Sequence, residues 1–108
     1  MLIYNRLIKK IGQLYMNEIC EVSNPELVLK QLKKHYGNEV DLYLSTSKHK
    51  KYMVFDEKGK KIHFGSIIHE DYTKHKDKQR RKNFRNRNRR WKDAEKYTPA
   101  HLSYYLLW

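Results

Sequence analysis

Apolar residues near the start of the chain recur every three or four positions, which is the spacing of one face of an α-helix. Polar residues occupy most positions between them, and Gly12 interrupts the run near its middle. We expect an amphipathic helix over residues 2–19. Its apolar face either covers the core of its own domain or contacts another protein, with candidate partner contacts at Leu7, Ile11 and Leu14.

A second helical pattern has its own start and stop signals. Ser23 or Asn24 can accept hydrogen bonds from the first free amides of a helix, and Pro25 suits the first turn. Leucines then recur at helical spacing as far as Gly37, a residue type that commonly ends helices. The sequence therefore predicts a helix over residues 25–36.

From about residue 40 the hydrophobic period changes to two, which is typical of half-buried β-strands. The alternation runs through three segments, residues 40–46, 51–56 and 60–65. The last two are joined by a short turn in which Gly59 can supply the positive φ of a tight hairpin. We expect a three-stranded antiparallel meander, with a basic loop at residues 48–51 and the second helix over one face of the sheet.

Positive charge dominates the next part of the chain. Residues 73–96 hold twelve of the 24 Lys and Arg residues and only three acids. Asp77 is a good N-cap for a helix over residues 78–90. Phe84 is the only large apolar residue in that helix, and Trp91 follows seven positions later on the same face. A helix that is polar on all sides buries little apolar surface by itself, so we expect it to lie on an acidic surface or to project into solvent.

The chain ends in a further helical segment. Thr98 and Pro99 form a cap and first turn, and the apolar face that follows consists of Leu102, Tyr105, Leu106 and Trp108. We expect this face to cover the core, although Tyr105 and Trp108 could instead contact a neighbouring subunit.

The predicted fold is α+β in a single small basic domain. A chain of 108 residues has room for one modest core. A helical part over residues 1–37 precedes the β-meander over residues 40–65. The Arg-rich helix and the C-terminal helix follow within residues 66–108.

Composition narrows the classes of function. The net charge of +12 favours binding to phosphates or to another acidic surface. The single cysteine, Cys20, cannot form an internal disulfide, and no apolar run approaches the roughly 20 residues of a membrane span. The first residues lack the pattern of a secretory signal, so we expect an intracellular protein or one packed inside a larger assembly.

Three interpretations of the basic segment remain open. Its cations could contact the phosphates of a nucleic acid, with the aromatic residues packed beneath them or stacked on bases. They could instead pair with carboxylates on an acidic protein surface, and a merely solvated charged face is the third alternative. The candidate binding residues are Lys74, Lys76, Lys78, Arg80, Arg81, Lys82, Phe84, Arg85, Arg87, Arg89, Arg90, Trp91 and Lys92.

Catalytic chemistry has little support in the sequence. The four glycines stand apart, so no phosphate-binding loop is present. A metal-dependent nuclease is a remote alternative that would need His63, Asp71 and His75 to converge on one cation. We therefore expect no enzymatic activity, no cofactor and no metal.

The second half of the chain resembles a family of small basic proteins from large nucleocytoplasmic DNA viruses. The resemblance is carried by an ordered set of short motifs. These are KYMV at residues 51–54, IHFG at 62–65, EDYTKHKD at 70–77, Arg80-Arg81, Phe84, Arg87, Trp91 and LSYYLLW at 102–108. The chain has Lys78 where such families often have Pro, and Phe84 where they tend to have Tyr.

The resemblance implies a viral protein that is carried in the virion, and it implies no activity. Together with the basic segment, it leads us to expect a non-enzymatic structural protein of a large DNA virus. Such a minor capsid or core component would bind the genome or an acidic capsid surface. The alternative is a sequence-independent nucleic-acid-binding protein that acts in the infected cell, outside the particle. A structural component should expose a hydrophobic patch on residues 2–19 or 102–108, and a free nucleic-acid binder should bury both.

Overall fold

The structure is a computed structural model that describes residues 8–9 and 15–108. Its sheet contains four strands in spatial order, β1 (Ile8–Lys9), β2 (Leu42–Leu44), β3 (Lys50–Phe55) and β4 (Lys61–Ser66). The helices are α2 (Tyr15–Val22), α3 (Pro25–Tyr36), α4 (Tyr72–His75), α5 (Lys78–Arg87) and α6 (Pro99–Leu102). A 3₁₀ helix, η1 (Arg89–Asp93), follows α5, and a π-helical turn, η2 (Ser103–Leu107), continues α6.

The α+β fold class and the antiparallel meander β2-β3-β4 are confirmed. The prediction of one helix over residues 2–19 is wrong at residues 8–9 and holds for residues 15–19, which belong to α2. Ile8 and Lys9 form β1, which pairs in parallel with Leu42 and Tyr43 of β2, and α2 begins only at Tyr15. Pairing with a strand more than thirty residues away overrides the local helical pattern there. Leu7, Ile11 and Leu14 lie outside the described residues.

Helix α3 has the predicted bounds because its ends are encoded locally. The Asn24 side chain accepts a hydrogen bond from the Leu27 amide, and Pro25 occupies the first turn. At the other end Gly37 adopts a φ of 96° and donates its amide hydrogen to the Lys33 carbonyl. These contacts satisfy backbone groups that a helix terminus leaves free.

The strands differ from the prediction at their ends, and most in β2, which spans residues 42–44 where 40–46 were predicted. Lys50, expected in the basic loop, begins β3, and Lys51, where the predicted loop and strand meet, lies within β3 and is buried. The β3–β4 turn has the predicted form, with Gly59 at a φ of 82°. There the Asp56 carboxylate accepts hydrogen bonds from the amides of Lys58 and Lys60.

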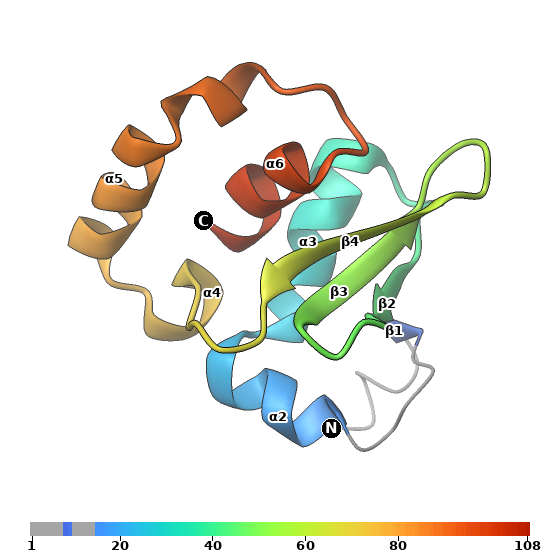
Figure 1. Cartoon of the computed structure of the whole chain (residues 1–108), viewed down its shortest axis with the longest axis horizontal. Helices are drawn as coiled ribbons and strands as arrows, with labels where there is room; N and C mark the ends of the chain where they lie inside the picture. Colours follow the sequence, from blue (N-terminus) through green and yellow to red (C-terminus); the bar gives the residue numbers. More distant parts are fainter. Residues whose placement is uncertain (1–7, 10–14) are drawn as a thin grey trace.

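The core lies between one face of the sheet, α3 and the C-terminal segment, as Figure 1 shows. Alternate strand residues point into it, and the turns α6 and η2 close it. Its buried members are Ile19, Val28, Leu29, Leu32, Leu42, Leu44, Tyr52, Val54, Ile62, Phe64, Leu102, Leu106 and Leu107.

The C-terminal segment is anchored by polar as well as apolar contacts. The Thr98 side chain accepts a hydrogen bond from the His101 amide, as the cap prediction required. The Tyr36 hydroxyl accepts from the Tyr97 amide and lies 2.7 Å from Nδ1 of His101. Burial raises the pKa of Tyr36 to about 12 and lowers the pKa of His101.

Candidate nucleic-acid interface

Helix α5 carries most of the basic segment and begins where the sequence predicts. The Asp77 carboxylate accepts hydrogen bonds from the amides of Gln79 and Arg80. The helix ends at Arg87, earlier than the predicted residue 90, and the Asn88 side chain at its C-cap donates to the Phe84 carbonyl. The chain then tightens into η1 (Figure 1).

Aromatic stacking attaches α5 to the rest of the domain. No residue of α5 is fully buried. The Phe84 ring stacks on Trp108, with centroids 4.3 Å apart and an interplanar angle of 7°, and it meets Trp91 edge-on at 5.9 Å. Phe84 and Trp91 therefore share one side of the segment, as their spacing predicted. Stacked and edge-to-face pairs of this kind contribute beyond simple area burial.

Two of the predicted binding residues turn inward and hold α5 in place. Nε of Arg81 donates to the Trp108 carbonyl at 2.7 Å, and its guanidinium lies 4.6 Å from the centroid of the Tyr72 ring. The Arg85 guanidinium lies 5.0 Å from the Tyr104 ring. Burial, and then the nearby Arg81, lower the pKa of Arg85. Cation–π contacts of this kind stabilise a basic helix against an aromatic surface.

The remaining predicted cations face outward and form what we call the basic face. Of these, only Arg80 has an ion-pair partner among the described residues, Glu70 at 3.7 Å, and both side chains are about half exposed. Such an exposed pair contributes little to stability. The basic face consists of Lys74, Lys76, Lys78, Arg80, Lys82, Arg87, Arg89, Arg90 and Lys92, all of them exposed.

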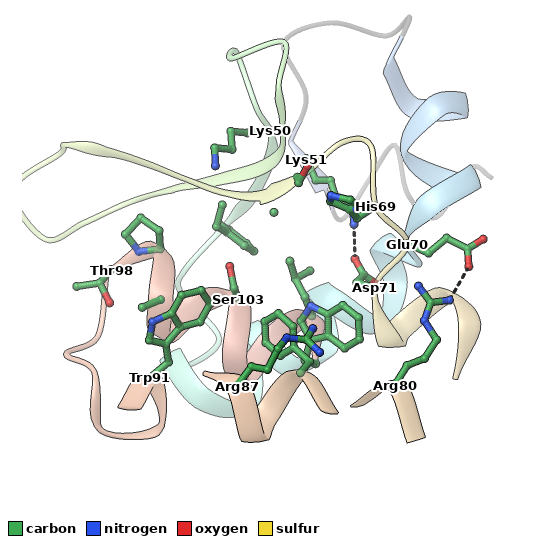
Figure 2. A pocket seen from close by; sticks show the side chains of 18 of the residues that line it. Lys50, Lys51, His69, Glu70, Asp71, Arg80, Arg87, Trp91, Thr98 and Ser103 are labelled. Atoms are coloured by element: carbon green, nitrogen blue, oxygen red, sulfur yellow. Dashed lines mark hydrogen bonds and ion pairs between the residues drawn. The ribbon is translucent and has the colours of Figure 1, made fainter. Parts of the chain in front are cut away.

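A cavity of about 800 Å³ separates α5 and η1 from the end of the sheet, and we call it the aromatic pocket. Phe84, Trp91 and Trp108 line it beside Phe64 of the sheet. Figure 2 shows Lys50 approaching from β3 and Arg87 from α5, with Trp91 and Ser103 between them. Its other lining residues are Lys51, Gly65, Ser66, His69, Glu70, Asp71, Arg80, Asn83, Thr98, Pro99, Ala100 and Leu107.

Lys50 and Arg87 are the free cations of this pocket. Both are exposed, and neither has an ion-pair partner within the described part of the chain. The other two cations of the lining, Lys51 and Arg80, are paired with Asp71 and Glu70 (Figure 2). The pocket therefore combines aromatic walls with two cations that can take up an anion.

A buried polar network adjoins the pocket through Lys51 and Asp71. Nζ of Lys51 donates to Oδ2 of Asp71 at 3.0 Å, and the two side chains are 2% and 1% exposed. Oγ1 of Thr73 donates to the other oxygen of Asp71 and lies 3.2 Å from the Ser23 hydroxyl. That hydroxyl accepts from the Tyr52 hydroxyl at 2.7 Å. Desolvation lowers the pKa of Lys51, and the carboxylate of Asp71 opposes this shift without cancelling it.

The three residues of the nuclease alternative make separate contacts. Asp71 is held by Lys51 and Thr73, and Nδ1 of His63 lies 2.7 Å from the Ser45 hydroxyl. Nδ1 of His75 accepts from the Asp77 amide. Among residues 8–9 and 15–108, no group of three or more His, Cys, Asp or Glu side chains is arranged to hold a metal ion.

The C-terminal residues considered for partner contact lie within the fold. Trp108 is half-buried against Phe84, and Tyr105 is half-buried with its hydroxyl donating to the Lys92 carbonyl at 2.8 Å. Leu106 and Leu107 are buried. None of the described helices is both long and apolar enough to cross a membrane.

Sequence reasoning located the basic face but missed the pocket. Its polar members outside the basic segment, such as Lys50, Ser66 and Ser103, belong to segments far apart in the chain, so no local pattern connects them. The nearest signal was the basic run at residues 48–51, which was placed in a loop.

Part of the chain is similar to a known protein family. Residues 40–88 match the model of a family of unknown function (DUF5754). The match covers the meander, α4, α5 and Asn88, which is just under half of the chain. No curated protein and no solved structure matches the chain. The chain is therefore similar over this region to a family whose description names no activity.

Proposed function

We propose that this protein binds nucleic acid without sequence specificity, through contacts between the basic face and backbone phosphates. The observation that carries the proposal is the exposure of nine cations on one segment, with a single weak ion pair among them. Such a concentration of unpaired charge is self-repelling until an anionic partner neutralises it. Phosphate binding then releases condensed counterions, and this release drives association.

The arrangement of the cations favours backbone contacts over base recognition. Arg87, Arg89 and Arg90 follow one another closely through the change from α-helix to 3₁₀ helix, so their side chains leave the segment in several directions. Base recognition in a groove would need a few side chains on one helix face. Guanidinium groups spread in this way suit phosphates.

The burial of the C-terminal segment supports nucleic acid over an acidic protein as the partner. Protein interfaces usually contain an apolar core. Leu102, Leu106 and Leu107 are buried in this chain, and the only exposed large hydrophobic residue among those described is Ile68, at 77%. The described part of the chain therefore offers charge to a partner but little apolar surface.

We further propose that the protein is non-enzymatic and belongs to a large DNA virus, as the motif resemblance implies. In that setting the genome is the polyanion that the basic face would meet, inside the particle or in the infected cell. An acidic capsid surface is the competing partner, and it is distinguished by the experiment below.

The test is fluorescence anisotropy with a labelled DNA duplex between about 50 and 200 mM salt. The variant replaces Arg87, Arg89 and Arg90 with Gln, and the matched control replaces Lys30, Lys58 and Lys60, which are exposed elsewhere on the domain. Three lost phosphate contacts should reduce the slope of log affinity against log salt by about 2.7. Over this fourfold salt range, wild type should lose about fortyfold more affinity than the variant. Equal slopes in wild type, variant and control would reject the proposal and favour an acidic protein surface.

A further inference from the structure

We infer that the aromatic pocket receives an unstacked base from a single-stranded nucleic acid, with the adjoining phosphates held by Lys50 and Arg87. This inference rests on the proposed function, because the basic face would bring the strand to the pocket. It adds that the protein distinguishes single strands, whose bases can leave the stack, from duplex.

The shape and lining of the pocket fit a planar ligand. Its volume of about 800 Å³ lies within the ~300–1,000 Å³ range of small-molecule sites. Its walls include Trp91, Trp108 and Phe84, none of them fully buried. Aromatic faces of this kind stack on any base, since every base has a π-face.

The polar groups of the pocket fit the remaining parts of a nucleotide. Lys50 and Arg87 come from different elements, β3 and α5, and Figure 2 shows them on different sides of the pocket. Ser103 lines the pocket between them, and its hydroxyl makes no hydrogen bond within the described residues. A base stacked on Trp91 could bond to this hydroxyl while its flanking phosphates meet the two cations.

Arg87 also links the pocket to the basic face, because it belongs to both. A strand that follows the phosphate contacts of Arg89 and Arg90 would arrive at Arg87 on the rim of the pocket. Single-strand binding proteins combine a cationic track with aromatic platforms in this manner. The charge of the basic face would supply affinity for any nucleic acid strand, and the aromatic pocket would supply the preference for strands with an accessible base.

Both tryptophans of the chain line the pocket, so intrinsic fluorescence reports on its occupancy directly. The full chain is titrated with an oligothymidylate of about twelve nucleotides. The comparison probes are an abasic oligomer of the same length and charge, a DNA duplex, and an acidic peptide containing one phenylalanine. Each titration records tryptophan emission and anisotropy at two salt concentrations.

We expect oligothymidylate to quench tryptophan emission and to bind about tenfold more tightly than the abasic oligomer, which has the same phosphates but no bases. The duplex should bind with little quenching. Trp91→Leu should bind oligothymidylate and the abasic oligomer about equally, while the salt dependence of binding stays the same. Phe55→Leu, which removes a half-buried aromatic residue outside the pocket, should leave the preference unchanged and so controls for loss of stability.

Four outcomes would overturn this inference. Equal, salt-dependent binding of oligothymidylate and abasic oligomer without quenching would leave the proposed function standing and remove the pocket's role. Base-dependent quenching that survives in Trp91→Leu would place the base elsewhere. Quenching by the acidic peptide alone would assign the pocket to a protein partner. Absence of salt-dependent binding to every nucleic acid probe would reject the proposed function as well.

Discussion

The buried pair of Lys51 and Asp71 should make each partner costly to remove alone and much less costly to remove together. The two charged atoms lie 3.0 Å apart and are almost fully buried. At an effective dielectric constant of about 20, their attraction is about 5 kcal/mol. Desolvation opposes this attraction, and the lowered pKa of Lys51 indicates that it is not fully offset. The pair therefore adds little net stability, although either charge left alone would be unsatisfied.

We expect Lys51→Met to lower the free energy of unfolding by about 3–5 kcal/mol, since it leaves the Asp71 carboxylate buried without its cation. Asp71→Asn should cost a similar amount. The double variant should lose at least about 2 kcal/mol less than the sum of the single losses, because no unpaired charge remains. Asn also retains an oxygen that can accept from Thr73.

The assay is urea unfolding followed by far-ultraviolet circular dichroism at 25 °C. Domains of this size have a free energy of unfolding of about 5–15 kcal/mol. A single variant therefore either keeps a measurable unfolding transition or is already unfolded without urea, and both results can be read from the spectrum. Glu70→Gln is the matched control, because it removes the exposed pair with Arg80 and should cost less than about 1 kcal/mol. Strict additivity of the two single losses in the double variant would refute the argument.

Two further predictions concern a close backbone approach and pH. Gly65→Ala should cost about 1–3 kcal/mol more in unfolding free energy than Gly59→Ala. Both glycines have φ near 80°, but only at Gly65 would the added Cβ lie 2.9 Å from Leu107, so equal losses would refute a packing origin. The lowered pKa of His101 means that the unfolded chain binds a proton first as pH falls below about 6.5. His101 should therefore contribute a loss of stability of up to about 1.4 kcal/mol per pH unit below that value, in urea melts from pH 7.5 to 5.5. Burial also lowers the pKa values of His35 and His75, so these residues add to the total slope. His101→Gln should reduce the slope of stability against pH, whereas the control His49→Gln, at an exposed position, should leave it unchanged. An unchanged slope in His101→Gln would show that His101 does not contribute to the pH dependence.

Local signals in the sequence were sufficient for the helix ends and for the meander. Asn24, Asp77 and Thr98 each act as the predicted N-cap, because capping depends on residues within one turn. Gly37 ends α3 for the same reason. The alternation of strand residues fixed which side chains enter the core, since the period of two follows from backbone geometry.

The features that escaped prediction depend on contacts between distant segments. Ile8 and Lys9 pair with β2 at the edge of the sheet, and this pairing outweighs the helical pattern of the local sequence. The burial of Lys51 escaped prediction because its partner Asp71 is twenty residues further along the chain. The inward turn of Arg81 and Arg85 depends on aromatic rings beyond their own helix, which no charge count reveals.

The polar network around Asp71 also restricts how β3 can align with its neighbours. Successive strand residues point to opposite faces, so Lys51 and Tyr52 leave β3 on opposite sides. Both nevertheless end in the same network, one at Asp71 and the other at Ser23. A shift of β3 by one residue would exchange the faces and leave both groups buried without these partners. Hydrogen-bonding groups thus reinforce the alignment that the apolar face of the sheet already favours.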